Sequence, residues 1–403
     1  MLRWMSAGES HGPALVGILE GMPAGVAITT AKVGEYLASR RAGYGRGARQ
    51  KFEQDRAHLV GGLIRGKTTG APIALLIENS EWPKWETVMS PDPVDPQALK
   101  VDAGKGDQRE VARNKPLTRP RPGHADLAGM LAYDLEEARP VLERASARET
   151  AMRVGLGAFA QEFLKQAGGI ELISYVTQIG QASLADSHPI PALCEQEKLA
   201  ENPVRCPDKK VSEQMIAQID AAKKNGDTIG GSVEVAAYGV PIGLGSHVSA
   251  DRRLDTRLAA ALMSIPAVKT VKVGDGSQPY LPGSAAHDEI VRADNGEITR
   301  ASNHAGGIEG GMSNGQPLRV SCAFKPISTV PRALRSIDLA NGEESRAIHQ
   351  RSDTCAVVPG AVIAQAQVAL VLADALLEHV GGYSLAQVRE NLQAYQKRVE
   401  ARL

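Results

Sequence analysis

Two histidines are the residues of this chain whose type and surroundings best suit proton chemistry. His11 lies in Gly8–Gly12 (GESHG), and His124 lies in Arg121–Asp126 (RPGHAD). Glycine and proline beside each histidine favour tight loops over packed helical or strand faces. Imidazole titrates near neutral pH, so either histidine alone could be structural, but two in loops beside arginine suggest proton transfer on an anionic substrate.

Arginines gather in glycine-bearing segments that could form the rest of such a site. Glycine at 43, 45 and 47 would weaken a helix, so we expect the arginines around them to project from a loop onto a small polyanion. A further polar run, Arg351–Pro359 (RSDTCAVVP), ends at a proline that opens an apolar helical stretch. The arginines of the first segment are Arg40, Arg41, Arg46 and Arg49.

Composition excludes several classes of function. The 46 basic and 46 acidic side chains cancel, and aromatic residues make up only 4%, so we expect no nucleic-acid partner. The four cysteines form no Cys-x-x-Cys pair and no zinc-like spacing with histidine, so we expect buried reduced thiols and no metal site.

The chain shows no sequence signal for a membrane. Its longest apolar stretch, Ala361–Leu377, is interrupted by Gln365, Gln367 and Asp374, which predicts a buried helix instead of a membrane span. The first motif begins at Gly8 and leaves no room for a signal peptide. We therefore expect a cytoplasmic protein.

The hydrophobic pattern predicts a mixed α+β fold. Strands are expected at 72–77, 232–236 and 318–324, each with glycine two or three residues before it, which hints at a duplicated unit. Helices are expected at 32–41, 129–135, 212–224 and 360–379, and another begins at a capping box, Ser146–Glu149, and ends at Gly168–Gly169. Residues 92–114 and 183–208, rich in proline and charge, are expected to be surface insertions.

One motif points to a different class of enzyme. Gly61–Thr68 (GGLIRGKT) matches the phosphate-binding P-loop pattern, but Pro72 and a predicted strand follow where a P-loop needs a helix. An ATP-binding enzyme therefore stays as the alternative. A glycine-rich interaction scaffold would leave the arginine, histidine and aspartate set unexplained.

Eight segments, in order along the chain, resemble the signatures of the chorismate synthase family. They are Ala7–Pro13, Arg40–Arg49, Arg121–Asp126, Arg144–Thr150, Gly226–Gly231, Asn303–Pro317, Lys325–Thr329 and Arg351–Ala356. The resemblance implies one large β-α-β sandwich domain over residues 1–403, with internal pseudo-symmetry and long active-site loops. It also implies a shikimate-pathway lyase that converts 5-enolpyruvylshikimate 3-phosphate to chorismate and phosphate by 1,4-elimination with reduced FMN.

The resemblance assigns roles to particular residues. His11 would stabilise the leaving phosphate, His124 would balance charge on the reduced flavin, and Asp353 would assist proton removal from the substrate ring, through the flavin. The substrate's two carboxylates and phosphate would be bound by Ser10, Arg40, Arg46, Arg49, Arg121 and Arg351.

The flavin would be held by Arg144, Ala145, Ser146, Ala267, Gly310, Lys325, Pro326, Ile327, Ser328, Thr329 and Arg351. Pro266 stands where the family usually carries glutamine, and it supplies neither an amide donor nor that side chain. The resemblance also implies a homotetramer. The reductant stays open: NADPH could act at Arg40 and Arg46, or a separate flavin reductase could supply reduced FMN.

Overall fold

The computed structural model describes residues 1–47, 55–99, 113–185, 188–294, 296–348 and 352–402. Arg49 and Arg351, both predicted to bind substrate, lie outside the described residues. So does the centre of the predicted insertion 92–114.

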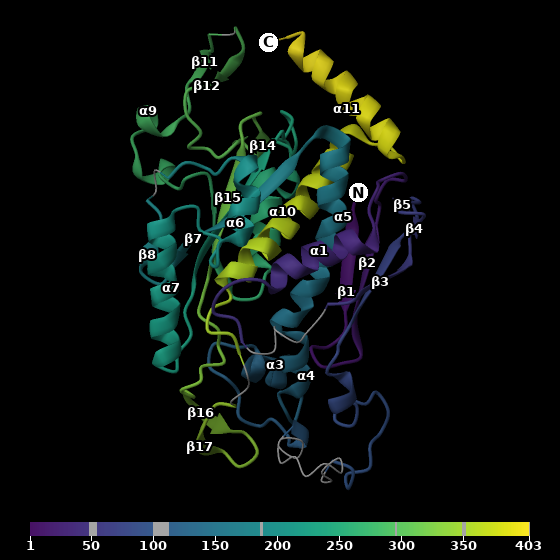
Figure 1. The fold of residues 1–403 in the computed structure, drawn as a ribbon, viewed down its shortest axis with the longest axis vertical. Coiled ribbons are helices and arrows are strands. Elements are labelled where there is room, and N and C mark those ends of the chain that lie inside the picture. The colour runs from purple at the N-terminus through teal and green to yellow at the C-terminus, as the bar shows by residue number, and fades with distance from the viewer. Residues whose placement is uncertain (48–54, 100–112, 186–187, 295, 349–351, 403) are drawn as a thin grey trace.

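An antiparallel four-stranded sheet forms one side of the molecule (Figure 1). Side chains alternate across it, so Leu15 and Leu19 are buried while Val16 and Ile18 between them face outward. The predicted strand 72–77 is the inner strand β6. In spatial order the strands are β1 (Arg3–Ala7), β2 (Ala14–Glu20), β6 (Ile73–Glu78) and β3 (Ala57–Gly61).

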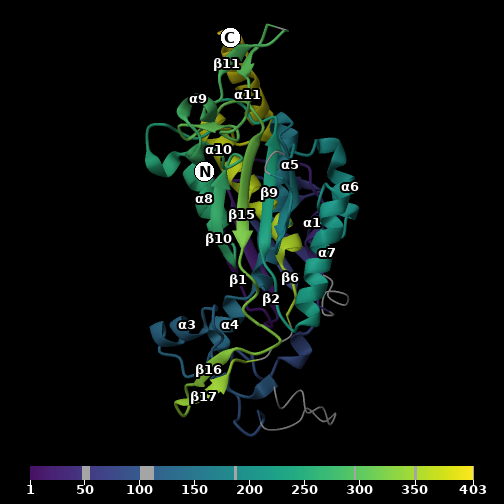
Figure 2. The same cartoon turned by 90° about the vertical axis from the view of Figure 1, so that its left-hand side faces the viewer.

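A five-stranded antiparallel sheet forms the other side (Figure 2). The predicted strands 232–236 and 318–324 are its inner strands β9 and β15. All three glycine-led strands are thus inner strands of a sheet. In spatial order the strands are β10 (Val268–Val273), β15 (Leu318–Phe324), β9 (Gly231–Tyr238), β7 (Glu171–Ile179) and β8 (Ala182–Ser183).

Helices fill the space between the two sheets (Figure 1). Small residues allow close approach: a Cβ atom added to Gly155 on α5 would lie 2.6 Å from Leu75 of β6, and one added to Gly157 would lie 2.5 Å from the Cβ of Ala366 on α10. This arrangement confirms the predicted α+β sandwich. The inner helices are α1 (Thr30–Arg41), α5 (Thr150–Gly168), α8 (Leu254–Met263) and α10 (Val357–Val380).

Helix α10 is long and apolar enough to cross a bilayer, but 94% of its most apolar window is buried inside the protein. It ends at Gly381, whose φ of 64° suits glycine, as the sequence predicted. It is therefore a core helix.

Shorter elements surround the sandwich. The helices are α3 (Asp126–Ala132), α4 (Arg139–Arg144), α6 (Gln196–Glu201), α7 (Lys209–Lys224), α9 (Gly283–Ala286) and α11 (Leu385–Glu400). The 3-10 turns are η2 (Trp82–Lys84), η3 (Ala147–Glu149), η4 (Leu193–Glu195), η5 (Ala250–Arg252) and η6 (Gln278–Tyr280). Two-stranded ribbons pair β4 (Leu63–Ile64) with β5 (Lys67–Thr68), β11 (Ile290–Arg292) with β12 (Ile298–Arg300), β13 (Ile308–Glu309) with β14 (Met312–Ser313), and β16 (Arg335–Asp338) with β17 (Glu343–Arg346).

Three local predictions differ from the structure. Ser146 does cap the turn η3, by accepting from Arg148 N, but the carboxylate of Glu149 accepts from Arg153 Nε at 2.8 Å instead of completing a capping box. Segment 183–208 is not only a surface insertion, because Val204 and Cys206 within it are buried. Cys194, expected to be buried, is exposed.

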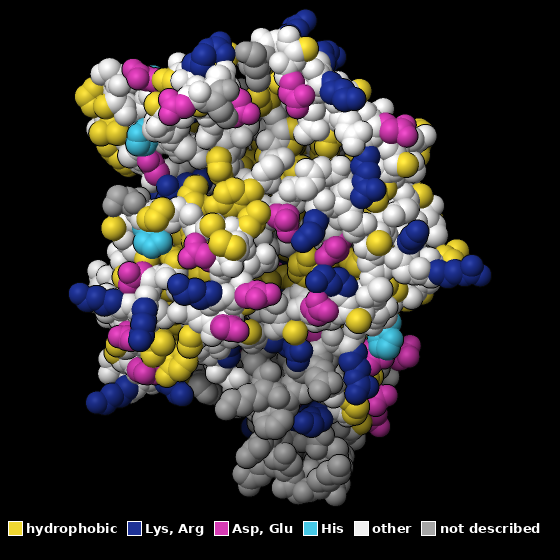
Figure 3. Space-filling model, turned by 45° about the horizontal axis from the view of Figure 1, so that its top comes forward, with side chains coloured by type: hydrophobic (Ala, Val, Ile, Leu, Met, Phe, Trp, Pro, Cys, Tyr) yellow, Lys and Arg dark blue, Asp and Glu magenta, His cyan; other side chains and the backbone are white. Residues whose placement is uncertain are grey.

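The surface carries no dominant charge on the face seen in Figure 3, where basic and acidic side chains are interspersed. This distribution agrees with the balanced composition.

Candidate active site

The imidazole of His11 contacts a carboxylate through Nδ1 and an aromatic ring through its face. Its Nδ1 lies 2.9 Å and 3.0 Å from the two carboxylate oxygens of Glu143, whose side chain is fully buried, and its backbone N donates to Glu143 Oε2 at 2.8 Å. The ring stacks on Trp85, with 3.8 Å between centroids. Beside it, Ser146 Oγ donates to Ser10 Oγ at 3.0 Å. The imidazole therefore has one fixed orientation.

His124 has a similar carboxylate partner. Its Nδ1 lies 2.6 Å from Asp126 Oδ1, and Arg121 Nε donates to Asp126 Oδ2 at 2.7 Å. Burial alone would raise the pKa of Asp126, but hydrogen bonds from His124 and Arg121 and their charges hold it well below its ordinary value. Arg121 also donates to Thr329 Oγ1 at 2.8 Å.

The predicted arginines Arg40 and Arg46 converge near Asp353. Arg46 Nη1 donates to Asp353 Oδ2 at 2.5 Å, and Gly47 N donates to Asp353 Oδ1 at 2.7 Å. Arg40 does not hang from the loop as expected: it lies in the last turn of α1, buried, and its Nε donates to Thr150 Oγ1 at 3.0 Å. Burial lowers the pKa of Arg40 to about 10, in spite of nearby Asp55, so it remains a cation at neutral pH.

These clusters are connected to one another. Arg148 pairs with Asp55, which also lies near Arg40, and its Nε donates to Asn79 Oδ1 at 2.9 Å. Asn79 Nδ2 donates to the carbonyl of Gly12 at 2.7 Å. These contacts link Arg40 to the His11 loop. Ser352, next to Asp353, donates to the carbonyl of Thr329 at 2.8 Å. Segments far apart in the sequence thus meet at the end of the molecule that carries α3 and α4 (Figure 1).

The predicted flavin-binding segment Lys325–Thr329 follows β15 and packs on the His124 loop. Lys325 Nζ and Ser328 Oγ both donate to the carbonyl of Gly123. Lys325 N donates to the carbonyl of Ala267 at 2.9 Å, and Ala267 has a φ of 72°. Pro326 and Ile327 complete this segment. Burial lowers the pKa of Lys325 below its ordinary value.

Arg144 ends α4, and Ala145 and Ser146 connect it to η3, on the His11 side of the site. The Arg144 guanidinium is exposed and donates to the carbonyl of Ser6 at 2.9 Å, so strand β1 orients it. These residues border the same group as Ser10.

Gly310 is the one described candidate that the chain does not bring to this end. It turns the β13–β14 hairpin, which precedes Leu318 at the start of β15, whereas Lys325 follows the end of β15. A seven-residue strand spans roughly 20 Å, so Gly310 and Lys325 lie at opposite ends of the sheet.

Sequence reasoning missed Glu143, Trp85 and Asn79 as partners of the His11 loop. Glu143 is 132 residues from His11, and no spacing rule connects them. Trp85 carried the better signal, because a tryptophan in a polar loop of a chain with few aromatic residues has little reason to be there unless it packs against something.

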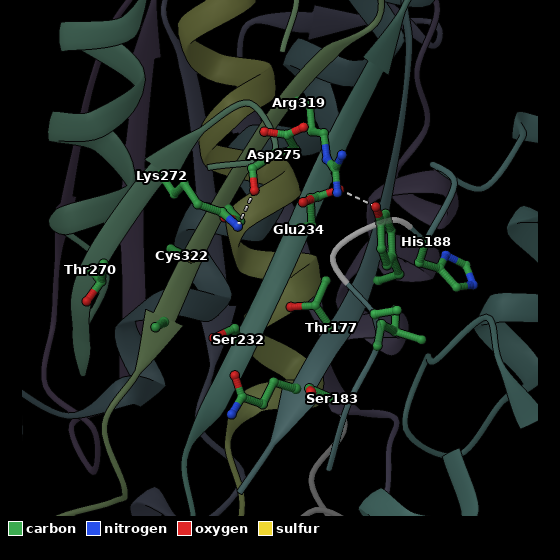
Figure 4. Close-up of a pocket in the computed structure, with 16 residues that line it drawn as sticks. Thr177, Ser183, His188, Ser232, Glu234, Thr270, Lys272, Asp275, Arg319 and Cys322 are labelled. Carbon is green, nitrogen blue, oxygen red and sulfur yellow. Dashed lines mark hydrogen bonds and ion pairs between the residues drawn. The ribbon is translucent and has the colours of Figure 1, made fainter. Parts of the chain in front are cut away.

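A cavity of about 280 Å³ lies elsewhere, on the five-stranded sheet (Figure 4). Arg319 and Glu234 face one another there, with Arg319 Nε donating to Glu234 Oε1 at 2.7 Å, and Tyr175 donates to the same carboxylate. The cavity contains none of the predicted site residues.

The P-loop pattern has no P-loop structure. Leu63–Ile64 and Lys67–Thr68 form the ribbon β4–β5, and the chain then enters strand β6 instead of a helix. Its amides therefore do not form a helix N-terminus for phosphate.

Comparison with known proteins decides the family. The model of the family described as chorismate synthase matches residues 2–377. The chain belongs to the chorismate synthase family. It is 60% identical over 396 residues to a chorismate synthase of Beutenbergia cavernae, with 98% of each chain covered, and 57% identical over 404 residues to one of Pseudarthrobacter chlorophenolicus, covering 100% of this chain and 99% of that one.

Structural comparison agrees. A crystal structure of chorismate synthase superposes with a TM-score of 0.76 at 34% identity, over 99% of this chain and 98% of the other. Membership in the chorismate synthase family makes the chain a chorismate-forming lyase of the shikimate pathway, and nothing favours an ATP-binding enzyme.

Proposed function

We propose that the chain forms chorismate by 1,4-elimination of phosphate from 5-enolpyruvylshikimate 3-phosphate at the end of the molecule that carries α3 and α4, with reduced FMN as cofactor. The observation that carries this proposal is the meeting of His11, His124 and Asp353, from distant segments, with Arg121 in the His124 group and Arg46 on Asp353. Two carboxylates and a phosphate require such cations.

His11 donates a hydrogen bond to the phosphate oxygen as the C–O bond breaks and negative charge develops there. Ser10, joined to Ser146 at 3.0 Å, provides a hydroxyl next to it. Arg46 and Arg121 bind substrate anions, and Asp353 assists removal of the ring proton. Because Arg46 and Gly47 both donate to Asp353, its carboxylate is held in place for this step.

The donor set at this end fits FMN. Arg144 and Lys325 supply cations, and Ser146, Ser328 and Thr329 supply hydroxyls, which together suit a phosphate and the carbonyl edge of a flavin ring. When bound, reduced FMN supplies an electron-rich ring beside the substrate without net oxidation. His124, on the loop packed against Lys325–Thr329, balances negative charge there.

Other features of the proposal come from the family resemblance: a cytoplasmic homotetramer, with reduced FMN supplied either by NADPH at Arg40 and Arg46 or by a separate flavin reductase. Gly310 supports a multi-chain arrangement. Within one chain it lies at the opposite end of β15 from Lys325, so a flavin site that includes both residues needs a second chain.

The test is anaerobic turnover of 5-enolpyruvylshikimate 3-phosphate with photoreduced FMN, monitored by chorismate absorbance. Chorismate formed with light alone supports the proposal, and formation with NADPH in the dark would show an intrinsic reductase. A preparation that binds ATP, shows no flavin spectral change and forms no chorismate would contradict it.

A further inference from the structure

Glu143 is placed to control the state of His11. It projects from α4 with a fully buried side chain, and both of its carboxylate oxygens lie within 3.0 Å of His11 Nδ1. Its Oε2 also accepts from the backbone N of His11, and its carbonyl accepts from Ser10 N at 3.1 Å. One residue thus fixes the loop backbone and the ring together.

The contacts of Glu143 suit a carboxylate that accepts hydrogen bonds. Arg139, one helical turn earlier and buried, interacts electrostatically with it. Its Oε2 accepts a hydrogen bond from the backbone N–H of His11, and both of its oxygens lie within 3.0 Å of Nδ1. With the carboxylate as acceptor, the hydrogen between the two side chains lies on His11 Nδ1.

We propose that Glu143 is a positioning residue that accepts a hydrogen bond from His11 Nδ1 and so fixes the ring with Nε2 directed to the substrate. The inference rests on the proposed role of His11 at the leaving phosphate. A neutral ring with hydrogen on Nδ1 has only an acceptor at Nε2, whereas the imidazolium donates there. Trp85 on the face of the ring prevents it from rotating away.

Charged groups near the ring or its carboxylate partner include Arg113, whose guanidinium lies 5.1 Å from the Trp85 ring, Glu9, whose carboxylate lies beside Gly12, and Arg139, which interacts electrostatically with Glu143. These groups are the same in the wild type and in Glu143→Gln. Removing only the charge of Glu143 therefore isolates its effect.

The experiment compares Glu143→Gln with Glu149→Gln, a matched loss of another buried glutamate, which pairs with Arg153 and not with a histidine. We expect Glu143→Gln to lower kcat by about 10²-fold or more with KM nearly unchanged, because a neutral amide no longer fixes the tautomer. The alkaline limb of its kcat–pH profile should move to lower pH, while the profile of Glu149→Gln stays in place.

A double-mutant cycle with His11→Gln tests whether Glu143 acts through the histidine. Glu143→Gln should then cost almost nothing further, and Glu143→Asp, which keeps the charge, should restore the pH profile even if kcat recovers only in part. An unmoved alkaline limb in Glu143→Gln, or additive losses with His11→Gln, would overturn the inference. Chorismate formation by the wild-type protein tests the proposed function separately.

Discussion

At the scale of single residues, the two histidines have the same kind of carboxylate partner but different neighbours. Each has Nδ1 against a buried carboxylate, Glu143 for His11 and Asp126 for His124. His124 also has Arg121 within 3.3 Å of both ring nitrogens, whereas His11 stacks on Trp85. The same side chain is therefore set in two electrostatic environments, which suits two different roles.

Replacing each histidine should separate these roles. We expect His11→Ala to lower turnover by about 10²–10⁴, with flavin binding close to wild type, because it removes a hydrogen-bond donor to the leaving group. His124→Ala should also slow turnover and, in addition, shift the protonation of bound reduced FMN, measured by anaerobic absorbance across pH. Equal losses with unchanged flavin titrations would contradict the assignment.

Asp126 should make stability depend on pH in a defined direction. Its pKa is lower in the folded protein than in the unfolded chain, so its stabilising effect is present above the ordinary value of 3.8 and is lost as pH falls through the lower folded value. We expect the stability difference between wild type and Asp126→Asn, from urea denaturation, to be roughly constant from about pH 6 to 8 and to shrink only in acid. A difference that grows in acid would be evidence against this.

At the scale of elements, glycines set how closely the helices pack, and two of them form a matched pair. Gly157→Ala on α5 would place a Cβ atom 2.5 Å from that of Ala366, so we expect a loss of about 1–3 kcal/mol in the free energy of unfolding. Gly34→Ala on α1 has open space within 4 Å among the described residues, so it should gain roughly 0.5–1 kcal/mol. Equal effects in denaturant titrations would mean that α5 and α10 pack less closely.

The sequence predicted elements better than contacts. Strand 318–324 was predicted at its observed bounds because β-branched and apolar residues alternate there, and the glycine stop of α10 was also confirmed. The capping box failed because Arg153, one turn later, competes for Glu149. Local pattern predicts which segments form, but it does not show such competition.

The candidate site was predictable to the extent that motifs carry its residues. His11, His124 and Asp353 lie in segments that resemble the family, whereas Glu143 was missed because its contact with His11 exists only after the fold forms. Gly310 is the reverse case. It lies in a segment that resembles the family, but within one chain it is at the end of β15 opposite Lys325.

At the scale of the whole molecule, the outer face of the four-stranded sheet is where the proposed homotetramer can be tested. Met5 pairs with Ile18 across β1 and β2, and Ile18 pairs with Ala74 of β6, so outward side chains form an apolar row. Met5 is 70% exposed and Ile18 is 37% exposed. Apolar side chains gathered on one sheet face are typical of a surface that another protein covers.

We expect Ile18→Lys to reduce the assembly by desolvating a charge in the contact, which light scattering after size exclusion would show as a smaller mass. Ile290→Lys, the same change at an exposed isoleucine of the β11–β12 ribbon, outside the four-stranded sheet, is the matched control and should leave the mass unchanged. If Gly310 completes a site on another chain, loss of the assembly by Ile18→Lys should also weaken FMN binding while leaving the folded chain intact by circular dichroism. A smaller assembly that binds FMN as tightly as wild type would place the whole flavin site within one chain, and an unchanged mass would show that this face is not a contact.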